Sequence, residues 1–173
     1  SSNLARFDVV RFGHNPECIE DLTVYYKASR GEGFGSEIKR RIMVGTFVSS
    51  AGYADAYYKQ AQRARTLIIQ DFNKAFEQVD VLMAPVSPTP AFKVGEKASN
   101  PLAMYLADAL TIPPSAAGVP AISLPCGFTS GGLPVGLQII GPMWSESLIL
   151  QMAAAYEQVS GLREKRPVIE IKS

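Results

Sequence analysis

The sequence contains few of the residues that most often build redox, metal and nucleophilic sites. It has two cysteines, Cys18 and Cys126, and a single histidine, His14. The cysteines lie far apart and follow no C-x-x-C pattern, so neither a disulfide framework nor a zinc site is indicated, and we expect reduced thiols. No group of His, Asp and Glu has metal-ligand spacing either. The sequence therefore predicts no metal site.

Long hydrophobic runs and an excess of one charge are also missing. No apolar run approaches the roughly 20 residues that a membrane-spanning helix needs, and residues 1–6 do not resemble a signal peptide. The chain has 17 basic and 16 acidic residues, a net charge of +1, so its overall charge does not attract it to nucleic acid or to an anionic membrane. The sequence lacks an initial Met, which favours a fragment or a processed product.

A complete catalytic set is not found in this sequence. A Ser-His-Asp triad would have to use His14, which precedes a predicted helix, where a solvated or capping imidazole is expected. There is no G-x-S-x-G motif, and no glycine-rich phosphate loop carries the required lysine. Cys126 has no identifiable base beside it, so we expect a small buried hydrophobe at a strand end. We assign no catalytic residue.

The composition does support a globular fold, because 173 residues with 47% hydrophobic content suffice for one domain with a core. Apolar spacing predicts a first helix over 16–29, with Asn15 as cap and Pro16 at its first position. Alternating glycines over 31–35 are expected to break it. Ser36 then caps a helix to about Ser50, and the longest helical pattern covers 54–78.

The second half of the sequence alternates predicted strands and helices. Residues 79–85 read as a buried strand that a proline-rich loop over 85–90 follows, because proline cannot donate to a sheet. A short helix over 101–110 should stop before Pro113. Strands over 121–125 and 134–141 are joined by a tight turn, and a last helix covers 146–160. Strands flanked by helices indicate an α/β fold with helices covering the sheet.

Six blocks in order resemble the amidase-signature family. The blocks cover nearly the whole chain and comprise residues 2–8, 33–46, 52–58, 80–85, 120–127 and 132–141. The last two are typical of the wider family, whereas 33–46 and 52–58 favour its tRNA-dependent amidotransferase branch. The resemblance implies that residues 1–173 form the carboxyl-terminal part of a single amidase domain, with a mixed sheet covered by helices.

The resemblance also implies an activity and its partners. Such an enzyme hydrolyses glutamine with a serine nucleophile, a bridging serine and a lysine base, and supplies ammonia for misacylated Glu-tRNA(Gln) or Asp-tRNA(Asn). No stretch here matches the glycine- and serine-rich signature that carries those residues, so the isolated chain is expected to be inactive. The implied partners are the missing amino-terminal half and subunits B and C of the complex, with tRNA contacted indirectly. The resemblance implies that a partner subunit uses ATP and Mg, and no cofactor is expected in this chain. It also implies that the complex is located in a bacterial cytoplasm or an organellar matrix.

What the resemblance assigns to this chain is a substrate-binding wall. Free glutamine presents a carboxylate and an ammonium group, which an arginine and a carboxylate bind through charge-assisted hydrogen bonds. Arg41 and Asp108 match the family positions for these two roles. The alternatives are an ion pair between Arg41 and Glu37, four residues earlier on one helical face, and a local capping or pairing role for Asp108. Lys39 and Arg40 are expected to face solvent or a partner.

Two further functions remain open at this point. The chain could belong to another amidase of the same signature that acts on a different small amide. It could also be a noncatalytic interaction module, in which the predicted helix over 54–78 presents Tyr57, Tyr58 and Phe72 to a partner. Core packing is the usual role of such aromatic residues.

Overall fold

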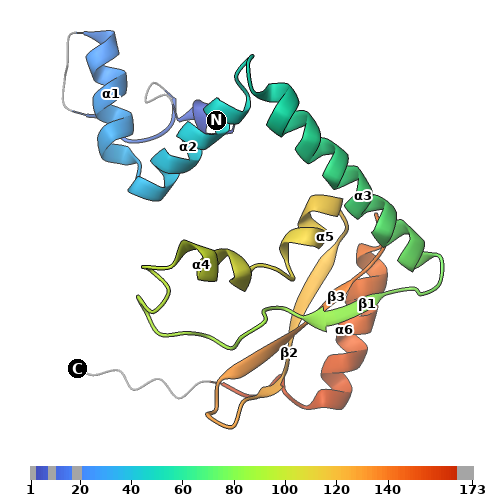
Figure 1. Ribbon diagram of the computed structural model, residues 1–173. Coiled ribbons are helices and arrows are strands. Elements are labelled where there is room, and N and C mark those ends of the chain that lie inside the picture. The colour runs from blue at the N-terminus through green and yellow to red at the C-terminus, as the bar shows by residue number, and fades with distance from the viewer. Residues whose placement is uncertain (1–2, 8–10, 17–20, 167–173) are drawn as a thin grey trace, which may run out of the picture. The chain divides into compact units, whose positions relative to one another are not determined.

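A computed structural model describes residues 3–7, 11–16 and 21–166 of the chain (Figure 1). The chain divides into two compact units, Ser1–Arg63 and Ala64–Ser173. Cys18 lies outside the described residues.

The first unit is helical. It comprises η1 (Leu4–Arg6), α1 (Leu22–Gly33), α2 (Ser36–Val48) and the π-helical η2 (Ala54–Tyr58). Asp21 caps α1, because its carboxylate accepts the Val24 N–H at 2.9 Å. The predicted cap Asn15 is wrong, since the helix begins at Leu22, and Asn15 instead accepts a 2.6 Å hydrogen bond from the Tyr25 hydroxyl.

The glycine run does not end α1 where the sequence predicted. The helix continues through Gly31 and Gly33, and the break is the extended backbone of Phe34 and Gly35. A glycine costs a helix only about 1 kcal/mol relative to alanine, so two of them weaken the last turn without stopping it. Gly35, and not Ser36, is the residue that precedes α2.

The second unit contains a three-stranded sheet in the order β1-β3-β2. Its strands are β1 (Leu82–Pro85), β2 (Ala121–Phe128) and β3 (Pro134–Ile140). The predicted hairpin is confirmed, because β2 pairs with β3 antiparallel across a turn in which the Gly132 N–H donates to the Thr129 carbonyl. The resemblance implied a mixed sheet, whereas both ladders within the described residues are antiparallel. A tight turn permits only that pairing for β2 and β3.

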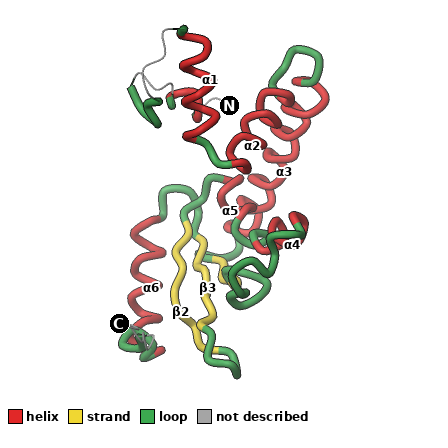
Figure 2. The backbone as a smooth tube through the Cα atoms, turned by 90° about the vertical axis from the view of Figure 1, so that its left-hand side faces the viewer, coloured by secondary structure: helices red, strands yellow, loops and turns green. Residues whose placement is uncertain are grey.

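Helices lie on both faces of this sheet (Figure 2). On one face α6 (Glu146–Ser160) covers β2 and β3, and the core consists of Leu124, Ile139, Ile149 and Ala153. The α/β class and the last helix are as predicted.

The other face of the sheet carries α4 (Pro101–Ala107) and α5 (Ile112–Ala117). The helix predicted over 101–110 stops before Pro113, as predicted, but is shorter, and Pro113 and Pro114 lie in the first turn of α5. Proline is tolerated there because first-turn N–H groups have no intrahelical acceptor. A hydrogen bond from Arg65 Nε to the Ala116 carbonyl, 2.7 Å long, ties α3 (Lys59–Phe76) to the end of α5. The helix predicted over 54–78 is present as two consecutive elements, η2 (Ala54–Tyr58) and α3 (Lys59–Phe76).

The part of the chain that the structure describes contains no candidate for a membrane-spanning helix. None of its helices combines the length and apolar character that a bilayer crossing requires.

Candidate functional site

Asp108 ends α4 and begins a tight turn into α5. Its main-chain carbonyl accepts the N–H groups of Thr111 at 3.1 Å and Ile112 at 3.0 Å. Its side chain is exposed, and within the described residues the carboxylate has no hydrogen bond or ion pair. The local capping contact of Asp108 is therefore made by its backbone, which leaves the carboxylate available to a cationic ligand.

Two hollows open where β1 ends, on the sheet face that carries α5. One is about 440 Å³ and the other about 310 Å³. They share Val86 and Ser123, and the smaller one is also lined by Thr111, Ser115 and Gln138. Asp108 lines neither, although Thr111, to which its carbonyl is bonded, lines the smaller one. The two hollows thus place hydroxyl and amide groups close to the turn that carries Asp108.

Gln138 fixes the geometry beside these hollows, and the sequence did not single it out. Its side chain is only 4% exposed, and Nε2 donates to the carbonyls of Leu110 at 2.8 Å and Pro85 at 3.2 Å. Buried polar groups are almost always hydrogen-bonded. A single amide residue in an otherwise apolar strand could therefore have indicated, from the sequence alone, that Gln138 bonds to another segment. Gln138 joins the middle of β3 to the end of β1 and to the turn after α4.

Arg41 lies on α2, where its Nε donates to Glu37 Oε1 at 2.9 Å. The same carboxylate receives Arg40 Nε at 2.8 Å and Arg40 Nη2 at 2.7 Å. Hydrogen bonds from Arg40 first, and from Arg41 second, lower the pKa of Glu37 from 4.5 to about 2. The ion pair that the sequence allowed is present, and the Arg41 side chain is still 67% exposed. The position of Arg41 therefore leaves its guanidinium within reach of a ligand.

Lys39 and Arg40 are exposed, as expected for residues that face solvent or a partner. Both also have partners within the unit, since Lys39 Nζ donates to the Gly31 carbonyl near the end of α1. Lys39 lines a groove of about 570 Å³ together with residues of α1, α2 and their connection: Thr23, Tyr26, Lys27, Arg30, Gly31, Phe34, Ile42 and Met43. The groove combines apolar and aromatic side chains with three cations.

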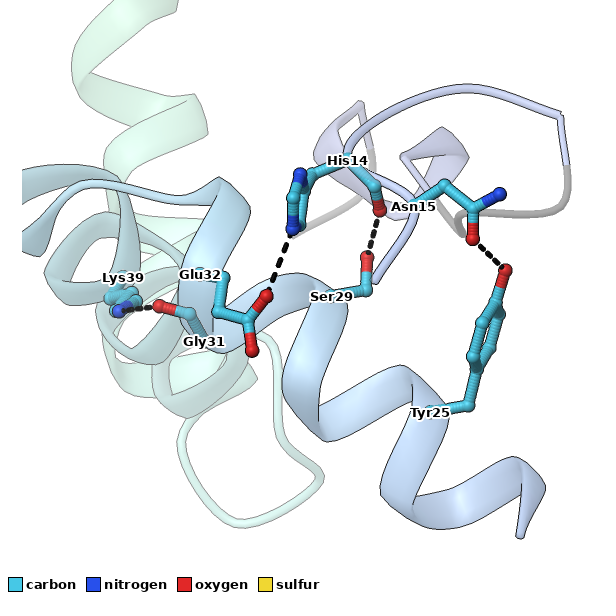
Figure 3. A network of polar contacts seen from close by, with 7 residues as sticks. All are labelled: His14, Asn15, Tyr25, Ser29, Gly31, Glu32 and Lys39. Atoms are coloured by element: carbon cyan, nitrogen blue, oxygen red, sulfur yellow. Dashed lines mark hydrogen bonds and ion pairs between the residues drawn. The ribbon is translucent and has the colours of Figure 1, made fainter. Parts of the chain in front are cut away.

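His14 belongs to a polar network that holds the segment 11–16 against α1 (Figure 3). Its Nε2 lies 2.9 Å from Glu32 Oε2, and the Ser29 hydroxyl donates to its carbonyl at 2.9 Å. The sequence predicted a solvated or capping imidazole; the side chain is 46% exposed, but its ring contacts the Glu32 carboxylate and does not cap a helix. Cys126 is half-buried in β2 beside an irregularity in its register with β3. Within the described ranges no group of His, Cys, Asp and Glu side chains is arranged to hold a metal ion.

The two predicted ligand residues belong to different units, with Arg41 in Ser1–Arg63 and Asp108 in Ala64–Ser173. Each is exposed on its own unit. Their shared role in one site stays a prediction.

Comparison with known proteins gives consistent matches over most of the chain. The family model described as Amidase matches residues 1–150. The A subunit of glutamyl-tRNA(Gln) amidotransferase from Geobacillus thermodenitrificans is 58% identical over 169 residues, which cover 98% of this chain and 35% of that protein. The chain thus spans about a third of the length of the relatives it matches.

Solved structures give the same picture. The crystal structure of the corresponding glutamyl-tRNA(Gln) amidotransferase protein from Thermotoga maritima matches with a TM-score of 0.64 and 41% identity, over 88% of this chain and 35% of that one. Allophanate hydrolase of Kluyveromyces lactis matches with a TM-score of 0.61 and 24% identity, over 80% of this chain and 23% of that one. The second likeness concerns the fold alone.

Proposed function

The chain belongs to the amidase family, and on that premise we propose that it forms the carboxyl-terminal substrate-binding wall of a glutamine-hydrolysing amidotransferase subunit. The observation that carries the proposal is 58% identity, across 98% of this chain, to the A subunit of a glutamyl-tRNA(Gln) amidotransferase. The whole enzyme would supply ammonia to convert misacylated Glu-tRNA(Gln) or Asp-tRNA(Asn).

Arg41 and Asp108 have the chemistry that free glutamine requires. The guanidinium of Arg41 would bind the α-carboxylate, where a planar fork of donors matches two oxygens. The carboxylate of Asp108 would bind the α-ammonium group. Its exposure and its lack of an internal partner among the described residues support this role. Both contacts would hold the substrate without taking part in bond breaking.

The bond-breaking step would be carried out by residues outside this chain. The family chemistry uses a serine nucleophile, a second serine and a lysine, and the sequence contains no stretch that matches their signature. The proposal therefore expects no glutaminase activity from the isolated 173 residues. It also places ATP and Mg on a partner subunit, and the complex in a bacterial cytoplasm or an organellar matrix.

The missing amino-terminal part of the domain would be the immediate partner of this chain, with subunits B and C completing the complex. The chain covers 35% of a relative, so most of such a subunit lies outside it. Apolar side chains stand exposed on the described helices, among them Met43 at 72% and Leu67 at 62%. Exposed apolar surface of this kind marks contact areas.

The test uses the full-length subunit in its assembled complex and measures glutamine hydrolysis. Arg41→Ala should raise KM for glutamine about 10- to 100-fold, because a hydrogen bond to a charged group is worth about 1.5–3 kcal/mol. Arg40→Ala is the matched control, since Arg40 is the neighbouring cation on the same helix and also binds Glu37; its KM should change less than about twofold. Asp108→Asn should act like Arg41→Ala.

The competing functions give different results in the same experiment. Normal glutamine kinetics in both Arg41→Ala and Asp108→Asn would reject the assignment of these two residues to glutamine binding. Copurification with subunits B and C separates an amidotransferase subunit from an amidase that acts alone. A purely noncatalytic module would bind the partners yet leave glutamine hydrolysis unaffected by either substitution.

A further inference from the structure

Gln138 stands out in the second unit as a buried polar side chain that the proposed chemistry does not use. It is 4% exposed in the centre of β3, opposite Ala84 of β1 and Ser123 of β2. The next residue, Ile139, is fully buried in the core that α6 covers. Because successive side chains of a strand point to opposite faces, Gln138 faces α5 and the turn after α4.

The amide of Gln138 makes two hydrogen bonds to segments that are distant in sequence. Nε2 donates to the Leu110 carbonyl at 2.8 Å and to the Pro85 carbonyl at 3.2 Å. Both partners are acceptors, so only the nitrogen side of the amide can satisfy them, which fixes its orientation. One side chain thereby holds the end of β1 and the turn after α4 in one arrangement.

The Leu110 contact reaches Asp108 through a rigid turn. Leu110 lies two residues after Asp108, and the Asp108 carbonyl closes the turn by accepting the N–H groups of Thr111 and Ile112. A weaker contact, Ser87 Oγ to the Ala107 carbonyl at 3.4 Å, holds the preceding residue to the segment that follows β1. Fixing the Leu110 carbonyl therefore also fixes the direction in which the Asp108 side chain leaves the turn.

We propose that Gln138 is a positioning residue for glutamine binding, which acts through the turn of residues 108–112 to place the Asp108 carboxylate. The inference rests on the proposed function, because it takes Asp108 as the ligand of the substrate ammonium group. Gln138 itself does not touch the substrate in this scheme. Its effect is on where the carboxylate stands, and misplacement by about 1 Å can cost on the order of 100-fold in activity.

The test measures glutamine-dependent and ammonium-dependent amidation of misacylated tRNA by the full-length subunit in its complex. Gln138→Met keeps the length of the side chain and removes the donor. We expect KM for glutamine to rise about tenfold with kcat nearly unchanged, and ammonium-dependent amidation to stay at the wild-type rate. Ile139→Val, which removes one methylene from the opposite face of the same strand, is the matched control and should leave KM for glutamine unchanged.

A double-substitution cycle separates positioning from a general loss of structure. In the Asp108→Asn background the carboxylate is already lost, so Gln138→Met should add less than about a twofold rise in KM. A full tenfold rise in that background, or an equal loss of ammonium-dependent amidation, would overturn the inference. Should Gln138→Met not yield folded complex, Gln138→Asn is measured instead, with the same expected and overturning results, because it withdraws the donor by one methylene.

The outcomes for the inference and for the proposed function are distinct. If Asp108→Asn raises KM and Gln138→Met does not, the inference fails while the role of Asp108 stands. If neither substitution affects KM for glutamine, both fail. A rise for Gln138→Met alone, with Asp108→Asn normal, also overturns the inference, because Gln138 would then act by another route.

Discussion

Alanine substitution at two glycines of α1, Gly31 and Gly33, should have opposite effects on stability. A Cβ added at Gly31 meets no atom within 4 Å, whereas a Cβ at Gly33 would lie 2.8 Å from the Cβ of His14. Neither glycine has a positive φ, so alanine fits both backbones. The difference between the two sites is therefore the approach of the segment that carries His14.

The magnitudes follow from the contacts. Gly31→Ala should stabilise the helix by about 0.5–1 kcal/mol, the usual advantage of alanine in a helix. Gly33→Ala must push His14 away, which weakens the bond from Ser29 to the His14 carbonyl and the pair with Glu32. Crowding costs about 1–3 kcal/mol and the gain in helix propensity offsets part of it, so a net loss of about 1–2 kcal/mol is expected.

The assay is urea unfolding, with hydrogen exchange of the α1 amides as a local probe. Gly31→Ala should raise the midpoint and Gly33→Ala should lower it, each by roughly 0.3–1 M if the slope is unchanged. His14→Gly removes the Cβ that causes the clash, so Gly33→Ala should cost nothing in that background. His14→Ala keeps the Cβ and should not relieve it. Equal stabilisation by both glycine substitutions would refute the close approach of His14 to Gly33.

Two further predictions concern the core of the second unit and the charge cluster on α2. Ile149→Ala should lower the free energy of unfolding by about 2–5 kcal/mol, because Ile149 is only 4% exposed. Leu150, on the same helix, is 57% exposed, so Leu150→Ala should lower it clearly less. Thermal unfolding measures both. Carbon-detected NMR titration should place the pKa of Glu37 near 2 and return it toward 4.5 in Arg40→Ala; a value near 4.5 in the unsubstituted chain would contradict the cluster. Since the folded pKa is the lower one, the contribution of Glu37 to stability is present above about pH 4.5 and is lost as pH falls through about 2.

Elements with strong periodicity and a definite stop could be predicted from the sequence. The last helix runs over Glu146–Ser160, as predicted, because its apolar spacing is regular and Gly161 ends it in the left-handed conformation, at φ 61. The β2–β3 hairpin could also be predicted from the sequence, because its turn residues lie between two apolar strands. In both places local propensity and tertiary packing favour the same structure.

Predicted and observed helix ends differ where the prediction rests on a glycine or proline alone. The three glycines over 31–35 were expected to break the helix after Ser29, and the break falls four residues later, at Phe34 and Gly35, because glycine only lowers helix propensity. The helix over 101–110 was expected to stop before Pro113 and does so, but it already ends at Ala107, and Pro113 lies in the first turn of the next helix, α5. Gln138 was overlooked for a related reason, because only the fold brings the Leu110 and Pro85 carbonyls to its amide.

The two roles that the sequence left open for Arg41 are compatible on energetic grounds. Arg40 alone gives Glu37 two hydrogen bonds, so the carboxylate of Glu37 stays paired when Arg41 turns to another partner. Transfer of Arg41 from Glu37 to a substrate carboxylate exchanges one charge-assisted bond for another, and an exposed pair of this kind is worth only about 0–1 kcal/mol. The Glu37 pair would then be a resting contact of an arginine that binds substrate, and it would help to keep the guanidinium ordered on α2 at little cost to affinity.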